Sequence, residues 1–143
     1  MAQAGPGCGC IAPAICPLPA SFFMTDDLKQ EFDAARIRHL LFKSKLRSFL
    51  YGSDTAQGPI RDPEQCAMGH WITERALPAY GHLPETHELD RLHRLIHTEG
   101  GRLMDLHLAG QSDAATSGLG HINKLADDIV ALLTTIEARL RAK

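Results

Sequence analysis

The sequence predicts an all-α protein, an antiparallel four-helix bundle with an additional short helix that carries a cysteine. Three observations support this. Apolar residues recur every three or four positions in several segments, no segment alternates apolar and polar residues as a strand would, and the stretches between the segments are short. The chain has 143 residues, which is long enough to bury a hydrophobic core without disulfides.

The first segment, residues 1–24, differs from the rest in composition. It is rich in Ala, Gly and Pro and holds three of the four cysteines, Cys8, Cys10 and Cys16. It lacks the basic start and the uninterrupted apolar stretch of a secretory signal, so we interpret it as a mostly disordered tail of a cytoplasmic protein. Its cysteines could bind a soft metal or oxidise, but the neighbouring prolines favour an unstructured extension. The folded domain is expected over residues 25–143.

The first helix is expected to start at Thr25, a good N-cap residue followed by Asp26 and Asp27 in the first turn, and to end at Gly52. Its apolar stripe alternates spacings of four and three residues. The stripe consists of Leu28, Phe32, Ala35, His39, Phe42, Leu46 and Phe49. One histidine, His39, therefore occupies a core position.

Three further helical segments follow. A short helix is expected from about residue 63 to residue 78, with Cys66 in or near its first turn. A third helix should run from residue 84 or 85 to about 110, and His93 falls on its buried face. The fourth should start at residue 112 or 113, tolerate Gly118 and Gly120, and continue to about Leu140.

The run "DRLHRLIHTEG" places His93 and His97 one helical turn apart. Residues four apart share a helix face, so this pair has two readings, core packing and a metal site. Burying an imidazole without a partner is costly, and both His39 and His93 lie on apolar stripes. A shared ion would satisfy both of them. With His97 and Cys66 they form a His3Cys set, whose nitrogen and thiolate donors zinc prefers.

Asp90, three residues before His93, could accept a hydrogen bond from the non-ligating nitrogen of a zinc-bound ring, although an exposed carboxylate is the more common situation. The remaining histidines lack a comparable set of neighbours. Solvated surface positions are expected for His70, His82, His87, His107 and His121.

Composition and motifs argue against several classes of function. Fifteen basic and seventeen acidic residues nearly balance, which does not indicate a nucleic-acid partner. There is no apolar run long enough to cross a membrane, so no membrane insertion is expected. A zinc with four protein ligands has no open position for water, and catalytic motifs are missing, so we do not expect an enzyme. A haemerythrin-like di-iron site would need core carboxylates that the stripes do not carry.

The segments "RHLLFKSKL", "QCAMGHW" and "HRLIH" together resemble the chemoreceptor zinc-binding (CZB) domain over roughly residues 30–140. The signature of that family is a histidine followed three residues later by an aromatic, then Cys-x-Leu-Gly-x-Trp, then His-x-x-x-His-x-x-Ala. By resemblance the zinc ligands are His39, Cys66, His93 and His97. Three positions depart from the family pattern without touching a ligand, namely Phe42, Met68 and Gly100.

The resemblance implies a cytoplasmic regulatory domain that binds Zn²⁺ and responds to zinc or, through Cys66, to oxidants such as hypochlorous acid. It also implies a symmetric homodimer, which the breadth of the first and fourth stripes favours as well. A chemoreceptor or a cyclic-di-GMP signalling protein would be its partner. The alternative is a structural zinc bundle or zinc reservoir without a switching role.

Overall fold

The computed structural model describes residues 20–142, and within that range every regular element is helical, which confirms the predicted fold class. The predicted tail with Cys8, Cys10 and Cys16 lies outside the described residues. The elements are α1 (Ala20–Leu50), α2 (Gly58–Arg61), η1 (Pro63–Gln65), α3 (Ala67–Trp71), η2 (Ile72–Ala76), α4 (Leu77–Tyr80), α5 (Pro84–Leu108), α6 (Ser112–Ser117) and α7 (Leu119–Arg141).

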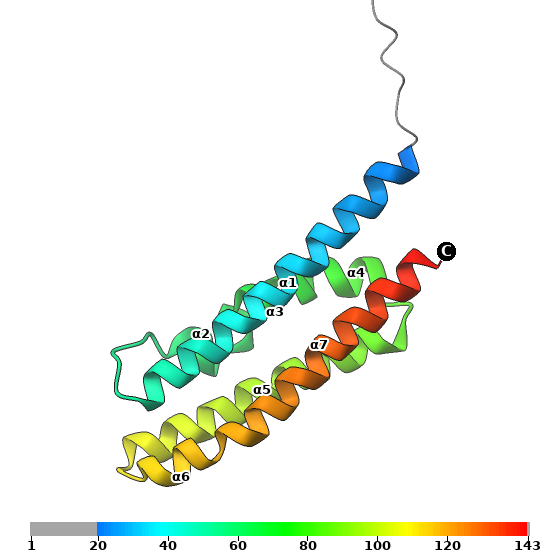
Figure 1. Ribbon diagram of the computed structural model, residues 1–143. Helices are drawn as coiled ribbons and strands as arrows, with labels where there is room; N and C mark the ends of the chain where they lie inside the picture. Colours follow the sequence, from blue (N-terminus) through cyan, green and yellow to red (C-terminus); the bar gives the residue numbers. More distant parts are fainter. Residues whose placement is uncertain (1–19, 143) are drawn as a thin grey trace, which may run out of the picture.

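Three long helices, α1, α5 and α7, and the run from α3 to α4 make up the bundle (Figure 1). Each of these four reverses the direction of the one before it, so α7 lies antiparallel to both α1 and α5 (Figure 1). Its contacts with these two helices are the most extensive in the molecule. In the described part of the chain, no helix combines the length and the apolar character that a membrane span requires.

Helix α1 begins at Ala20, so the predicted start at Thr25 is wrong. The residues before Thr25 include no proline or glycine after Pro19, and nothing in them stops the helix from extending toward the N-terminus. The stripe itself is confirmed, because all its members are buried except Leu28, which is half-buried. The helix ends where predicted: Gly52 adopts φ +95°, a conformation that glycine adopts without strain.

The predicted fourth helix is interrupted. Helix α6 ends and α7 begins at Gly118, where the chain comes close to α5. A Cβ atom at Gly118 would lie 2.2 Å from Leu103 Cδ2, so a larger residue would have to displace the Leu103 side chain. The prediction that a single helix would tolerate Gly118 is therefore wrong at this position.

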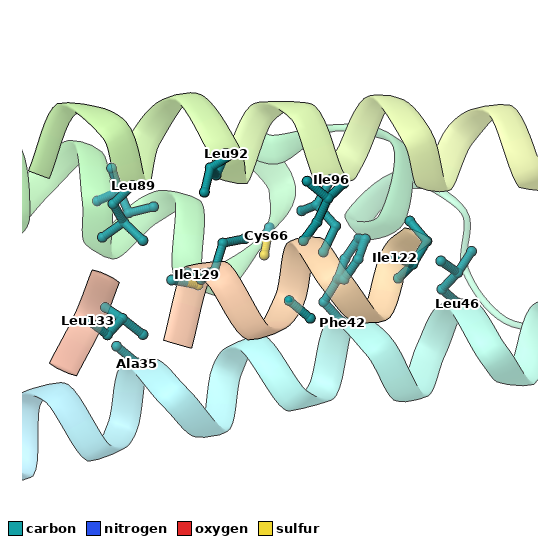
Figure 2. Close-up of a cluster of buried hydrophobic side chains, with 14 of the residues drawn as sticks. Ala35, Phe42, Leu46, Cys66, Leu89, Leu92, Ile96, Ile122, Ile129 and Leu133 are labelled. Carbon is teal, nitrogen blue, oxygen red and sulfur yellow. The ribbon is translucent and has the colours of Figure 1, made fainter. Parts of the chain in front are cut away.

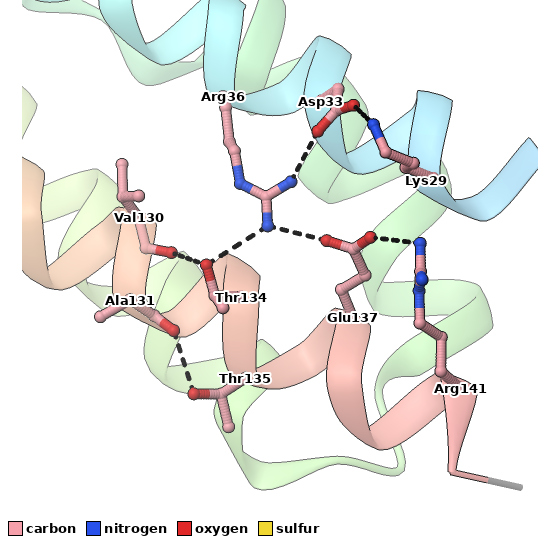
Figure 3. Close-up of polar contacts among 9 residues, drawn as sticks. All are labelled: Lys29, Asp33, Arg36, Val130, Ala131, Thr134, Thr135, Glu137 and Arg141. Atoms are coloured by element: carbon pink, nitrogen blue, oxygen red, sulfur yellow. Dashed lines mark hydrogen bonds and ion pairs between the residues drawn. The ribbon is translucent and has the colours of Figure 1, made fainter. Parts of the chain in front are cut away.

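The core fills the space between the helices, and Cys66 lies within it (Figure 2). Ala35 of α1, Leu89 of α5 and Leu133 of α7 are among the side chains that pack there (Figure 2). On the surface, Arg36 of α1 donates to Glu137 of α7 at 2.7 Å (Figure 3). This half-buried ion pair links α1 to α7.

A polar cluster attaches the segment after Cys66 to α1. Glu31 accepts hydrogen bonds from the Trp71 indole at 3.0 Å, the Arg75 guanidinium at 3.0 Å and the Tyr80 hydroxyl at 2.9 Å. Burial alone would raise the pKa of Glu31, but these three hydrogen bonds outweigh it and the pKa is lowered. Glu31 therefore links the end of α3, the π-helical turn η2 and the end of α4 to α1.

Candidate metal centre

His93 and His97 point into the core from neighbouring turns of α5. Both rings are almost completely buried, and their Nε2 atoms lie 3.1 Å apart. Two ring nitrogens that face each other at this distance can share one proton or bind one ion. The predicted burial of His93 is confirmed, and His97 is buried beside it.

Cys66, at the start of α3, lies close to this histidine pair of α5. It is the N-cap residue of α3, and its Sγ atom and one nitrogen from each ring all lie within 4.8 Å of one another. Among residues 20–142, this is the only group of three His, Cys, Asp or Glu side chains that meets this criterion. One thiol and two imidazoles are thus gathered in a buried position, and these donors suit zinc.

The close approach of the Cys66 segment to α5 depends on Gly69. A Cβ atom at this position would lie 1.9 Å from the carbonyl oxygen of Pro63 and 3.1 Å from Cε1 of His93. Any larger residue would push the start of α3 away from η1 and α5. Gly69 thus permits the close packing of α3 against η1 and α5.

His97 is oriented by a backbone contact that the sequence did not indicate. Its Nδ1 atom lies 2.6 Å from the carbonyl oxygen of Ile60, a buried residue of the short helix α2. A carbonyl only accepts, so Nδ1 carries the proton and Nε2 is left with its lone pair directed at His93 and Cys66. Such a hydrogen bond fixes the tautomer that a metal-binding histidine needs.

His39 projects from the buried stripe of α1 and lies parallel to the ring of Phe42. A backbone hydrogen bond with Ala126 engages the ring, while its Nε2 atom is buried and has no hydrogen-bond partner within residues 20–142. An unpartnered buried ring nitrogen costs about 1–3 kcal/mol. His39 lies outside the three-residue group above, so the complete four-ligand set remains a prediction.

The environment keeps all three rings neutral at pH 7. Burial, followed by the charge of Lys43, lowers the pKa of His39 from 6.5 to about 4. Burial, followed by the neighbouring His97, lowers the pKa of His93 from 6.5 to about 3. The pKa of His97 is also lowered, again by burial first. A neutral imidazole is the form that binds metal, so the rings are ready to ligate without losing a proton.

The residues present therefore fit a zinc ion. They offer a thiol, two converging nitrogens and a third buried nitrogen that lacks a partner. A Mg²⁺ or Ca²⁺ ion would need oxygen ligands, and no carboxylate belongs to this group.

Other predicted positions lie elsewhere. Asp90 is partly exposed and accepts a hydrogen bond from Arg94 at 3.2 Å, so its role beside a zinc-bound ring stays a prediction. Four of the remaining histidines are exposed as expected: His70, His82, His87 and His121. His107 is different, because it is half-buried against Phe49 and its Nδ1 atom is buried without a hydrogen-bond partner among the described residues.

A pocket of about 140 Å³ lies on the surface beside Cys66. It is lined by Arg38, Leu41 and Lys45 of α1 and by Cys66 and Ala67, among others. Cys66 is 6 % exposed and is therefore buried in the core, but it is also one of the residues that line this pocket. A small molecule could approach the thiol from this side.

Comparison with known families adds one finding. The family model of the chemoreceptor zinc-binding domain matches residues 39–104, a range that contains the three gathered residues and His39. Searches of curated proteins and of solved structures gave no match.

Proposed function

Since residues 39–104 belong to the chemoreceptor zinc-binding domain family, we propose that this chain is a zinc-binding regulatory domain. Its ion would be held by His39, Cys66, His93 and His97. The observation that supports this most strongly is the meeting of one buried thiol with two buried ring nitrogens. The family is a sensory rather than a catalytic domain, and a site closed by four protein ligands leaves no position for a reacting water.

Each proposed ligand has its own support in the fold. The Ile60 carbonyl orients His97, and a backbone hydrogen bond with Ala126 holds the ring of His39. A bound zinc would satisfy the lone pair of His39 and would hold the Cys66 sulfur as a thiolate. Zinc would thereby join α1, α3 and α5 at one point.

Cys66 is the proposed point of oxidant sensing. Hypochlorous acid would oxidise a zinc-bound thiolate to sulfenic acid and would itself be reduced to chloride, so that the sulfur gains an oxygen and the ligand bond weakens. The pocket beside Cys66 supports this proposal, because Cys66 lines it together with two cationic side chains, Arg38 and Lys45. The ion would then be released, or α3 would move, and a partner could recognise the change.

In this proposal the domain acts in the cytoplasm and signals by contact to a chemoreceptor or a cyclic-di-GMP signalling protein. The alternative function is a structural zinc bundle or zinc reservoir. The hydrophobic core does not distinguish the regulatory from the structural function. Its buried apolar residues run the whole length of the bundle and are not restricted to the surroundings of the site. The two functions differ in what happens when zinc leaves.

Metal content tests the zinc proposal. We expect one zinc per chain by mass spectrometry after mild chelation, and a large loss of zinc in His93→Ala and in Cys66→Ala. His121→Ala is the matched control, because that ring is exposed on α7. If both ligand variants keep full zinc content, the assignment of the site is wrong.

Circular dichroism before and after chelation separates the two functions. A regulatory domain should stay largely helical without zinc but change its shape, whereas a structural site should unfold. For the oxidant, a variant that lacks Cys8, Cys10 and Cys16 isolates the reaction of Cys66. If stoichiometric hypochlorous acid oxidises methionines while Cys66 stays unmodified and zinc stays bound, the oxidant role is refuted.

A further inference from the structure

The basic residues in the second half of α1 differ from those in the rest of the molecule. In the part of the chain that the structure describes, each Lys and Arg forms an ion pair with a carboxylate except Arg38, Lys43, Lys45 and Arg47. These residues all belong to α1, which carries no acidic residue after Asp33. A group of cations without counter-ions in its own chain attracts anions from solution.

Two of these cations line the same pocket. Lys43 and Arg47 lie one helical turn apart on α1, and they line a pocket of about 300 Å³ to which α7 also contributes, the α1–α7 pocket. Its other polar lining residues are Ser44 of α1 and Asn123 of α7, and no carboxylate lines it. Among residues 20–142, these polar side chains have no hydrogen-bond or ion-pair partner. Each of them can therefore donate a hydrogen bond to a ligand.

This set of donors suits a phosphate group. An arginine guanidinium can bind two phosphate oxygens through parallel hydrogen bonds, and a lysine adds a point charge. The guanidinium of Arg47 lies over the ring of Tyr51, 5.6 Å from its centroid, and this contact orients it without using its N–H groups. Two cations also match the charge of a phosphate monoester, which is about −1.5 to −2 at pH 7.

The α1–α7 pocket also has an apolar part. Leu119 and Ile122 of α7 line it, and Ile122 belongs to the hydrophobic core. The volume of about 300 Å³ lies at the lower end of the range for sites that bind small organic molecules. A ligand that fills the pocket therefore carries an apolar body in addition to its anionic group.

We propose that the α1–α7 pocket binds a phosphate ester of a small organic molecule. The phosphate contacts Lys43 and Arg47, Ser44 and Asn123 donate to its remaining oxygens, and the apolar body packs on α7. None of the proposed zinc ligands lines this pocket. The site is thus separate from the metal centre, and it does not depend on the proposed zinc-binding function.

A heteronuclear NMR titration of the full chain with phenyl phosphate tests the site. We expect saturable shifts of the amides around Lys43 and Asn123, and an affinity that falls as NaCl is added because salt screens exposed charges. Lys43→Gln and Arg47→Gln should each weaken binding at least about tenfold. Lys45→Gln is the matched control, because Lys45 also lacks an ion pair in the described chain but lines the pocket beside Cys66 instead, and it should leave binding unchanged.

A wild type that does not bind phenyl phosphate overturns the proposal, and so does an equal loss of affinity in Lys45→Gln and Lys43→Gln. Circular dichroism and zinc content, measured for each variant, keep these outcomes separate from unfolding and from the metal site.

Three further ligands test which parts of the molecule are recognised. Inorganic phosphate should bind more weakly than phenyl phosphate, because it lacks the apolar body, and phenol should bind more weakly because it lacks the charge. Leu119→Ala should weaken the binding of phenyl phosphate but not that of inorganic phosphate. Equal affinity for the two phosphates refutes the apolar part of the site. Binding to phosphatidylglycerol vesicles without binding to phenyl phosphate overturns the small-molecule ligand in favour of a lipid headgroup.

Discussion

Acidification of the metal-free protein should destabilise it strongly, because three histidines are buried in neutral form. Burial lowers the pKa of His39 to about 4 and that of His93 to about 3, whereas both titrate near 6.5 in the unfolded chain. Between these values the unfolded state binds protons that the folded state does not. The free energy of unfolding therefore keeps its full value above about pH 6.5, and it decreases as the pH falls from 6.5 toward 4.

The size of the effect follows from the pKa shifts. Each proton bound only by the unfolded state costs about 1.4 kcal/mol of folding free energy per pH unit. From pH 6.5 to pH 5, each of His39 and His93 contributes about 2 kcal/mol, or about 4 kcal/mol together. His97, whose pKa is also lowered, acts in the same direction. A loss of this size is a large part of the roughly 5–15 kcal/mol that stabilises a typical domain.

Urea unfolding followed by circular dichroism, with chelator present and at several pH values between 7.5 and 5, measures this dependence. His39→Leu should reduce the loss at pH 5 by about 2 kcal/mol, because it removes one titrating group whose Nε2 atom has no hydrogen-bond partner in the described structure. Added zinc should delay the loss, since a nitrogen bound to the ion cannot take a proton.

The result that would refute this reasoning is an identical pH dependence in the wild type and in His39→Leu. It would mean that the His39 ring titrates as freely in the folded chain as in the unfolded one. The ring would then be accessible to water, in contradiction to its almost complete burial.

The helices could be predicted because each one buries a single face. The stripes of α1, α5 and α7 repeat at helical spacing, and a pattern of this length leaves little choice of structure. Helix ends are less well determined. Thr25 has the character of an N-cap residue, but the helix continues past it to Ala20, and the predicted fourth helix is broken at Gly118, which packs closely against Leu103.

The residues of the site were predictable for a different reason. His39 and His93 interrupt apolar stripes, and a polar residue on such a stripe requires a partner. The backbone groups that hydrogen-bond to these histidines cannot be recognised from the residue types in the sequence. The Ile60 carbonyl, which orients His97, could equally belong to any other residue type, and α2 is too short to produce a periodic pattern. The role of Glu31 as an acceptor could not be predicted either, because acidic residues are common in this highly charged helix.

Two further predictions concern the attachment of the Cys66 segment. Glu31→Ala should destabilise the protein by about 1–3 kcal/mol in urea unfolding, because the Trp71 indole and the Tyr80 hydroxyl both lose their acceptor. Gly69→Ala should weaken zinc binding in a competition assay with a chromophoric chelator. Its Cβ atom would lie 1.9 Å from the Pro63 carbonyl oxygen, and only a shift of α3 can relieve that overlap. Because Cys66 is the N-cap residue of α3, such a shift moves the sulfur relative to α5. Gly120→Ala is the matched control, since nothing lies within 4 Å of a Cβ atom there, and it should keep its zinc affinity while gaining about 0.5–1 kcal/mol of stability from the higher helix propensity of alanine. Equal zinc affinity in the two variants would show that the position of Cys66 does not depend on the close packing at Gly69.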